Sequence, residues 1–259
     1  MKKRLNYLFY ISIIIGIIFL IFIIKKFNYS NNEKFSSSII TFLTQEETKN
    51  FILKDEDKYL NNLSIYDLRA RKCKTYIEYL YQAGNSTLEF TQEQKEKIFK
   101  CANEAKLYFN NNMNWVFALV NNNYEEGFPH TRGNIIFLSS TIINYSDIEL
   151  TKTLIHESIH IYQRYNKEEI KKYLEKNNFT ISRLRNNTSL MRANPDLDDY
   201  IYKDKNGIEM IANYNSEFPT SISDISLTTL SNEHPFEYMA YTIAEEYSRK
   251  ILNKYNKIK

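Results

Sequence analysis

An apolar run near the N-terminus constrains this chain more than any other segment. The 18 residues from Tyr7 to Ile24 carry no charged side chain, and basic residues flank them at positions 2–4 and at positions 25 and 26. A helix rises about 1.5 Å per residue, so a run of this length spans roughly 27 Å, which is enough for the hydrocarbon core of a bilayer. We therefore predict an N-terminal transmembrane anchor over residues 1–27.

A cleavable signal peptide is the alternative interpretation of this segment. The run is longer than the usual apolar core of a signal peptide, and Lys25, Lys26 and Phe27 follow it where a cleavage site needs small residues. We therefore favour an uncleaved, single-pass anchor in a membrane. Basic residues are slightly denser before the run than after it, which favours a cytoplasmic N-terminus and an extracytoplasmic or lumenal location for the rest of the chain.

The charge composition excludes one class of partner. The 34 Lys and Arg residues are mixed along the sequence with 31 Asp and Glu residues, and the net charge is only +3. A nucleic-acid-binding protein needs a basic stripe or patch, so we expect no nucleic-acid partner. With 259 residues, of which 43% are hydrophobic, the chain can form one sizeable domain together with a small helical module.

Residues 28–112 are predicted to contain a linker and a helical module. Residues 28–44 begin as a polar stretch without periodicity and are predicted to be the linker. In the module, residues 45–112, a first helix is expected over 45–61, and Ser64 is expected to cap a second helix that runs to about Ala83. A capping box at residues 91–94 opens a third helix that ends near Asn110.

The two cysteines fall in this predicted module. Cys73 and Cys101 lie in helices on either side of a short loop, at similar distances from its centre. In an antiparallel helix pair that placement makes a disulfide geometrically possible. Two reduced cysteines in a hydrophobic core are the other interpretation, and the sequence leaves both open.

The character of the sequence changes from Trp115, near the start of a second predicted domain over 113–259. Apolar runs at 115–120 and 134–138 have the length of strands, and Asn206-Gly207 between residues 200–203 and 208–211 predicts a hairpin. Helices are expected over 167–176 and from Pro235 to about Leu252. We therefore predict an α+β fold with a small mixed sheet.

The strongest chemical signal is the pattern His-Glu-x-x-His at residues 156–160. A capping box at residues 146–149 starts the helix that carries it, so His156 and His160 lie one turn apart on one helix face and can bind the same zinc ion. Glu157 lies close enough to take a proton from metal-bound water without being a ligand. Two surface histidines would favour a polar helix, whereas this helix is largely apolar, and buried imidazoles need partners.

A catalytic zinc ion needs three protein ligands and an open coordination position. The motif at 156–160, together with Glu237 followed three residues later by Ala240, resembles the gluzincin-like arrangement of the zincin metallopeptidases. Metzincins are excluded because their longer motif requires Gly and His where this chain has Gln163 and Asn166. Uncharacterised zincin-like proteins of large DNA viruses look similar over roughly residues 115–250.

The resemblance implies that Glu237 is the third zinc ligand, with His234, Glu245 and Glu246 as alternatives. It implies a zincin-like catalytic domain that hydrolyses peptide bonds, with Glu157 as the base and a peptide or protein as substrate. An edge strand over residues 133–138 would pair with the extended substrate. The oxyanion that forms on the scissile carbonyl could be held by His130, Arg132 or Tyr241. The other interpretation is that each of these three is an ordinary surface or packing residue. The alternative function is a catalytically inactive zincin-like binding or structural protein of a membrane or virion surface.

Overall fold

The computed structural model describes residues 39–109, 113–186, 189–229 and 232–256. The predicted anchor over residues 1–27 lies outside these ranges. Within them, no helix is both long and apolar enough to cross a membrane. Ile39–Lys259 forms one compact unit, so residues 45–112 and 113–259 do not form two separate bodies.

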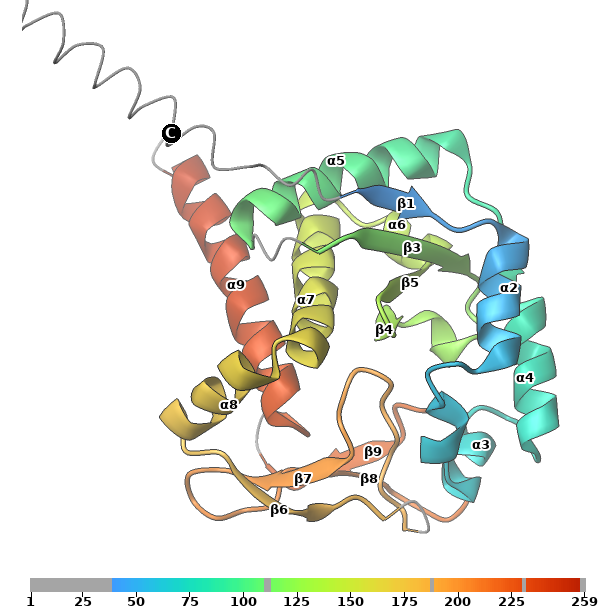
Figure 1. Ribbon diagram of the computed structural model, residues 1–259, viewed down its shortest axis with the longest axis vertical. Coiled ribbons are helices and arrows are strands. Elements are labelled where there is room, and N and C mark those ends of the chain that lie inside the picture. The colour runs from blue at the N-terminus through green and yellow to red at the C-terminus, as the bar shows by residue number, and fades with distance from the viewer. Residues whose placement is uncertain (1–38, 110–112, 187–188, 230–231, 257–259) are drawn as a thin grey trace, which may run out of the picture. The chain divides into compact units, whose positions relative to one another are not determined.

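A five-stranded mixed sheet lies at the centre of this unit (Figure 1). Three strands run parallel in the order β1–β3–β5, and β4 adds to β5 in the antiparallel direction, while the short β2 pairs with the end of β3. The bounds are Ile40–Phe42 for β1, Thr87–Leu88 for β2, Trp115–Val120 for β3, His130–Arg132 for β4 and Ile135–Ser139 for β5. The strands predicted at 115–120 and 134–138 are confirmed. The linker prediction is wrong at residues 40–42, because these residues form β1.

Helices cover both faces of the sheet, which gives the mixed α+β architecture expected from the sequence (Figure 1). On β3, Trp115, Phe117 and Leu119 pack with α5, α7 and α9. The alternating residues Ala118 and Val120 pack on the opposite face, against the helices between residues 45 and 85. A strand that is buried on both faces reads as a continuous apolar run, which explains the sequence of β3. The helical bounds are Gln45–Lys54 (α2), Tyr59–Asn62 (η1), Ile65–Ala70 (α3), Tyr76–Asn85 (α4), Gln92–Tyr108 (α5), Glu125–Gly127 (η2), Ser140–Ile143 (α6), Asp147–Tyr165 (α7), Lys167–Lys176 (α8) and Pro235–Asn256 (α9).

The helical segment departs from the prediction at two breaks. The expected helix 45–61 ends at Lys54, because Asp55 adopts a left-handed conformation, and η1 follows it. The expected helix 64–83 is interrupted between α3 and α4, where Lys72 has a φ of 60° and Arg71 turns into the interior. Cys73 lies in this connection and Cys101 packs in the core on the other face of the sheet, so both thiols are free and the disulfide is not formed.

Two small sheets complete the unit between α8 and α9. β6 (Thr180–Leu184) pairs with β7 (Tyr200–Lys203), and β8 (Ala212–Tyr214) pairs with β9 (Ile225–Leu227). The turn predicted at Asn206-Gly207 forms, since Asp204 and Ile208 are joined by a main-chain hydrogen bond and Gly207 has a φ of 79°. The second arm of the hairpin is reduced to one isolated bridge between Lys203 and Glu209, while β7 pairs with β6 on its other edge.

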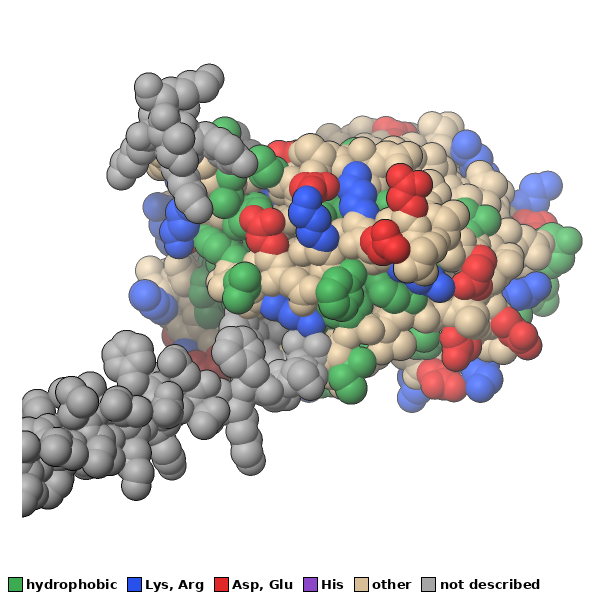
Figure 2. Space-filling model, turned by 90° about the horizontal axis from the view of Figure 1, so that it is seen from above, with side chains coloured by type: hydrophobic (Ala, Val, Ile, Leu, Met, Phe, Trp, Pro, Cys, Tyr) green, Lys and Arg blue, Asp and Glu red, His purple; other side chains and the backbone are tan. Residues whose placement is uncertain are grey.

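The surface on the α5 side carries both signs of charge. Figure 2 shows Lys and Arg side chains interspersed with Asp and Glu side chains across this face. Isolated ion pairs account for part of the pattern, such as the pair between Lys100 and Asp147, whose atoms lie 2.6 Å apart. This described face therefore has no patch of a single sign.

Candidate metal centre

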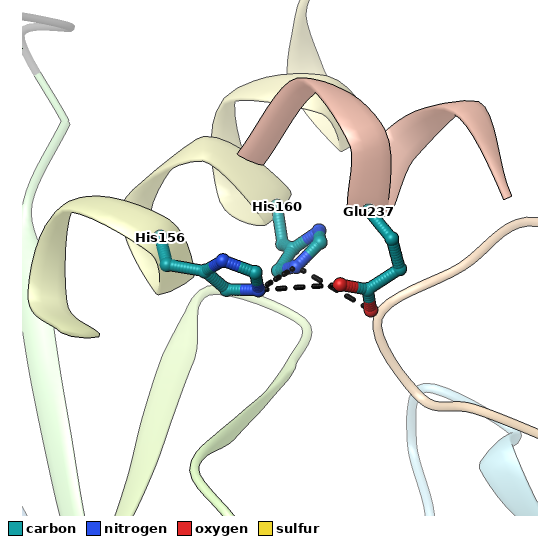
Figure 3. A group of neighbouring side chains, drawn as sticks. All are labelled: His156, His160 and Glu237. Atoms are coloured by element: carbon teal, nitrogen blue, oxygen red, sulfur yellow. Dashed lines mark hydrogen bonds and ion pairs between the residues drawn. The ribbon is translucent and has the colours of Figure 1, made fainter. Parts of the chain in front are cut away.

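Three side chains from two helices meet at one point (Figure 3). His156 and His160 come from adjacent turns of α7, and Glu237 comes from the first turn of α9. The two imidazole Nε2 atoms lie 3.0 Å apart. Glu237 places one carboxylate oxygen 3.3 Å from His156 Nε2 and the other 3.8 Å from His160 Nε2. The ligand atoms all lie within 4.8 Å of one another, so these three residues could hold a metal ion.

The close packing of α7 against α9 brings the three residues together. Ser146 caps α7 by accepting a hydrogen bond from the N–H of Glu149, as its sequence predicted. In α9, Ala240 is fully buried between Glu237 and the apolar residue Ala244. A residue without a bulky side chain at this position lets the backbones of the two helices approach each other.

Gln163 orients His160, and the sequence prediction missed this role. The Nδ1 atom of His160 lies 2.9 Å from Gln163 Oε1, and Gln163 Nε2 donates to the carbonyl of Phe236 at 3.0 Å. An amide oxygen can only accept, so Nδ1 carries the proton and Nε2 presents its lone pair to the cluster. Burial also lowers the pKa of His160, which favours this neutral form. Gln163 thus links the orientation of one ligand to the start of α9.

Glu237 is held by its neighbours in an ionised form. Burial alone would raise the pKa of Glu237, but its polar neighbours, among them the Arg192 guanidinium, lower it below its usual range. The amide of Asn194 donates to Glu237 Oε1 at 3.2 Å and to Glu233 Oε1 at 2.9 Å. Because Arg192 also binds Glu233, Glu237 is fixed through a short chain of polar contacts that the sequence did not reveal.

Glu157 lies beside the cluster in a different environment. Its side chain is buried, and among the described residues its Oε2 atom has no hydrogen-bond partner. Burial, together with the carboxylates of Asp196 and Glu237, holds the pKa of Glu157 well above its usual range. A buried carboxyl oxygen without a partner is costly to the fold, which makes Glu157 a candidate functional residue.

The alternative third ligands take other partners. His234 accepts a hydrogen bond from the N–H of Phe236 on Nδ1 and places Nε2 3.2 Å from Asp198, so it caps the start of α9. Glu245 pairs with Lys152 on the surface. Glu246 is exposed. Of the four candidates, the structure brings only Glu237 to the two histidines.

The three candidates for holding an oxyanion separate in the structure. Arg132 is buried between Asp55 and Asp57 and donates to the hydroxyl of Tyr124. The prediction that Arg132 holds an oxyanion was therefore wrong. The guanidinium of Arg132 instead pairs with these two carboxylates and so holds η1 and the preceding turn against the sheet. His130 lines the cavity described below, with Nδ1 at 3.0 Å from Phe128 O. Tyr241 lines the same cavity, and its ring centre lies 4.5 Å from that of His156.

The strand predicted to lie at the edge of the sheet is internal. β5 lies between β3 and β4, because the chain turns back at Gly133 and adds β4 outside β5. Gly133 has a φ of 59°, which a glycine adopts without strain. The true edge strand beside the candidate metal centre is therefore β4, with three residues.

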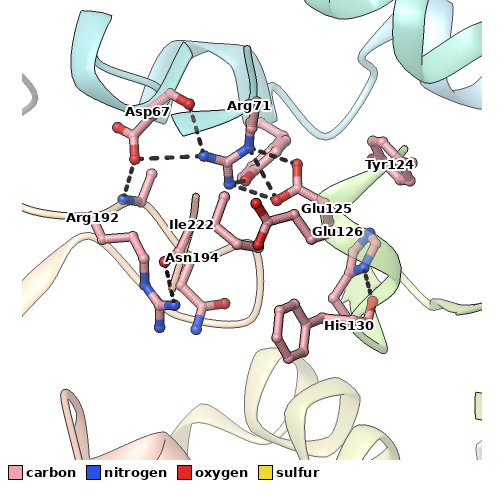
Figure 4. Close-up of polar contacts among 12 residues, drawn as sticks. Asp67, Arg71, Tyr124, Glu125, Glu126, His130, Arg192, Asn194 and Ile222 are labelled. Carbon is pink, nitrogen blue, oxygen red and sulfur yellow. Dashed lines mark hydrogen bonds and ion pairs between the residues drawn. The ribbon is translucent and has the colours of Figure 1, made fainter. Parts of the chain in front are cut away.

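A cavity of about 460 Å³ opens next to the cluster. Its wall includes His156, Glu157 and Glu237 on one side. Figure 4 shows the opposite wall, where Arg71, from the connection between α3 and α4, binds Glu125. Arg71 Nε lies 2.9 Å from Glu125 Oε1, and both side chains are buried. The cavity thus joins the candidate metal centre to the helical segment before β3.

The Arg71–Glu125 pair holds a strained turn. Glu125, Glu126 and Gly127 have consecutive φ values of 46°, 53° and 75°. Left-handed conformations cost about 1–3 kcal/mol each for residues other than glycine. A Cβ atom on Gly127 would lie 2.5 Å from Asn122 Oδ1, so this position requires glycine. The ion pair therefore stabilises a wall of the cavity that the backbone alone would not adopt.

Comparisons with protein-family models, with curated proteins and with solved structures give no match.

Replacing Gln163 tests whether it orients a metal ligand. We expect Gln163→Leu to lower the affinity for zinc by about 10–100-fold, because His160 loses its partner at Nδ1. Gln163→Glu keeps an acceptor for His160 and should retain an affinity closer to that of the wild type. Competition with a fluorescent chelator measures both affinities on the purified full-length chain. Equal affinities for Gln163→Leu and the wild type would show that Gln163 has no such role.

The Arg71–Glu125 pair predicts how stability depends on pH. Burial alone would raise the pKa of Glu125, but the Arg71 guanidinium lowers it from 4.5 to about 2. A carboxyl group with a lowered folded-state pKa stabilises the fold fully above pH 4.5, and this contribution is lost as the pH falls towards 2. We expect Glu125→Gln to lower the free energy of unfolding at pH 7 by roughly 3–5 kcal/mol, because Arg71 stays buried without its partner.

The free energy of unfolding at several pH values between 7 and 2 checks this prediction. Glu125→Gln should lose less stability than the wild type between pH 4.5 and 2. The exposed Glu175 provides the control, because Glu175→Gln should stay within about 0.5 kcal/mol of the wild type at each pH. A wild-type pH dependence in Glu125→Gln would contradict the assignment.

Proposed function

We propose that this protein is a membrane-anchored zinc metallopeptidase with a zincin-like catalytic domain. The observation that carries the proposal is the meeting of His156, His160 and Glu237 at one point, next to the buried carboxyl group of Glu157. Residues 1–27 would anchor the chain in a membrane, with the catalytic domain on the extracytoplasmic or lumenal side. The substrate class is a peptide or protein.

The donor set suits zinc in a catalytic role. Two imidazole nitrogens and one carboxylate form the ligand set of several zinc peptidases, and three protein ligands leave one coordination position open. His156 and Glu237 both line the cavity, so the open position has room for a substrate group. Zinc bound there would supply Lewis-acid activation of a water molecule and of the scissile carbonyl group.

Glu157 is the residue of this chain suited to move the proton. Its Oε2 atom has no protein partner in the described ranges, and burial together with the carboxylates of Asp196 and Glu237 raises its pKa, which makes it a stronger base than an exposed glutamate. As a general base, Glu157 would take a proton from the attacking water and then donate it to the nitrogen of the leaving amine. Glu157 lines the cavity beside His156, which gives it access to both atoms.

An inactive binding or structural protein with the same fold is the alternative. A metal held for structure alone favours a closed site with four protein ligands, whereas the described ligand cluster has three. A structural site also has no use for a buried carboxyl group without a partner, which destabilises the fold. Both observations support the catalytic function over the alternative.

Glu157→Gln tests this function. We expect it to lower kcat/KM for peptide hydrolysis by about 10²–10⁴-fold, because the base is lost, while about one zinc ion stays bound per chain. Cleavage of a library of quenched fluorescent peptides, with and without a chelator, measures the activity of the full-length chain. Glu168→Gln, on the exposed face of α8, is the matched control and should keep wild-type activity.

The outcomes separate the two functions. A wild-type chain that binds zinc and cleaves no peptide would support the inactive binding protein. Activity that survives in Glu157→Gln, or in the presence of the chelator, would contradict the proposed mechanism.

A further inference from the structure

The edge of the main sheet beside the candidate metal centre is closed to strand pairing. On β4, the main-chain groups that point away from β5 belong to Thr131. The N–H of Thr131 donates to Asp196 Oδ1 at 2.6 Å, and its carbonyl accepts from Arg164 Nη2 at 3.0 Å. Arg164 also binds the carbonyl of Pro195 at 2.7 Å, which holds this segment over the strand. An extended peptide therefore cannot add to β4 without displacing the hydrogen bonds that Thr131 makes with Asp196 and Arg164.

A second edge strand borders the same cavity. Ile225 and Leu227 of β9 line the cavity together with His156 and Glu237, whereas Ser226 between them does not. In Figure 1, β9 lies with β8 in the lower part of the molecule, and β4 lies higher, beside α7. The cavity thus borders two edge strands, β4, whose outward edge is closed, and β9.

The bonding pattern of β9 shows which of its groups face outward. Main-chain bonds between antiparallel strands alternate along each strand. Ser226 is therefore bonded to Asn213 of β8, and the main-chain groups of Ile225 and Leu227 point away from β8. The register follows from two flanking bonds, which join Asn215 N–H to Asp224 O and Thr228 N–H to Ile211 O.

The opposite edge of β8 is already covered. Residues 190–192 run beside it, with main-chain bonds from Arg192 to Ala212 and from Tyr214 to Leu190. Within the described residues, β9 pairs with β8 alone. Ile225 uses its N–H locally, by donating to Ser223 O. The Ile225 carbonyl and both main-chain groups of Leu227 remain on the outward edge.

We propose that this edge of β9 binds the substrate as an added antiparallel or parallel strand, and this rests on the proposed peptidase function. The substrate is then an extended, unfolded peptide segment, because only an extended backbone matches the spacing of a strand edge. Main-chain hydrogen bonds to Leu227 and Ile225 supply affinity without regard to sequence. Alternate substrate side chains lie over Ile225 and Leu227, which favours apolar residues at every second position.

Leu227→Pro tests the inference, because proline removes the outward N–H and leaves the bonds to β8 in place. Losing one hydrogen bond of about 0.5–1.5 kcal/mol should raise KM for a long peptide by roughly 2–13-fold, with little change in kcat. Leu184→Pro is the matched control. Leu184 lies on β6, is 62% exposed and does not line the cavity, and its main-chain groups also point away from the neighbouring strand. It should leave KM unchanged.

A change in the peptide avoids any effect on folding. N-methylation of the substrate backbone at successive positions removes one N–H at a time, and we expect KM to rise at alternate positions only, as strand pairing requires. A flat response to methylation, or equal KM values for Leu227→Pro and Leu184→Pro, would overturn the inference while leaving the peptidase function standing. If the wild-type chain cleaves no peptide at all, the proposed function fails and this inference fails with it.

Discussion

The packing of α7 against α9 is the constraint on which the site depends. It brings His156 and His160 next to Glu237, although more than seventy residues separate them in the sequence. Gln163 joins the two helices by binding His160 and the carbonyl of Phe236, one residue before Glu237. A shift of α9 relative to α7 would therefore move Glu237 away from the two histidines and also break the contact between Gln163 and Phe236. The ligand geometry and the helix packing are one structural feature.

The rest of the unit shapes the cavity in front of this cluster. The sheet supports α7 through the apolar side chains of β3 and β5. The helices before β3 supply Arg71, which holds Glu125 and the strained turn at the far wall. Segment 192–196 brings Asn194 to Glu237 and Asp196 to β4. Segments that the sequence divides between a module and a catalytic domain thus build one cavity.

Local patterns in the sequence predicted much of this fold. Helix starts, strands and buried helix faces could be predicted because each is decided by neighbours along the chain. Examples are the caps at Ser146 and Thr91, the apolar run of β3 and the apolar side of α9. The site residues at 156–160 followed from their spacing on one helix. The prediction of Glu237 as the third ligand depended on the resemblance to zincins, because no local sequence pattern links Glu237 to the two histidines.

The predictions that failed depend on contacts between distant segments. The helix 64–83 breaks because Arg71 turns inward to reach Glu125, 54 residues away. Arg132 was misjudged for the same reason, because its partners Asp55 and Asp57 lie about 75 residues earlier. The order of β4 and β5 depends instead on a local turn at Gly133, which the sequence prediction missed. Gln163 could have been found as the polar residue three positions after His160 on an otherwise apolar helix face. The links through Asn194 and Asp196 left no comparable signal.

Crystallography of the zinc-loaded full-length chain, with anomalous data collected on both sides of the zinc absorption edge, tests the central claim most directly. The account predicts one strong anomalous peak bounded by His156 Nε2, His160 Nε2 and the carboxylate of Glu237, with Glu157 nearby and not coordinated. A peak elsewhere, or the two imidazoles turned to different surroundings with no peak between them, would contradict it.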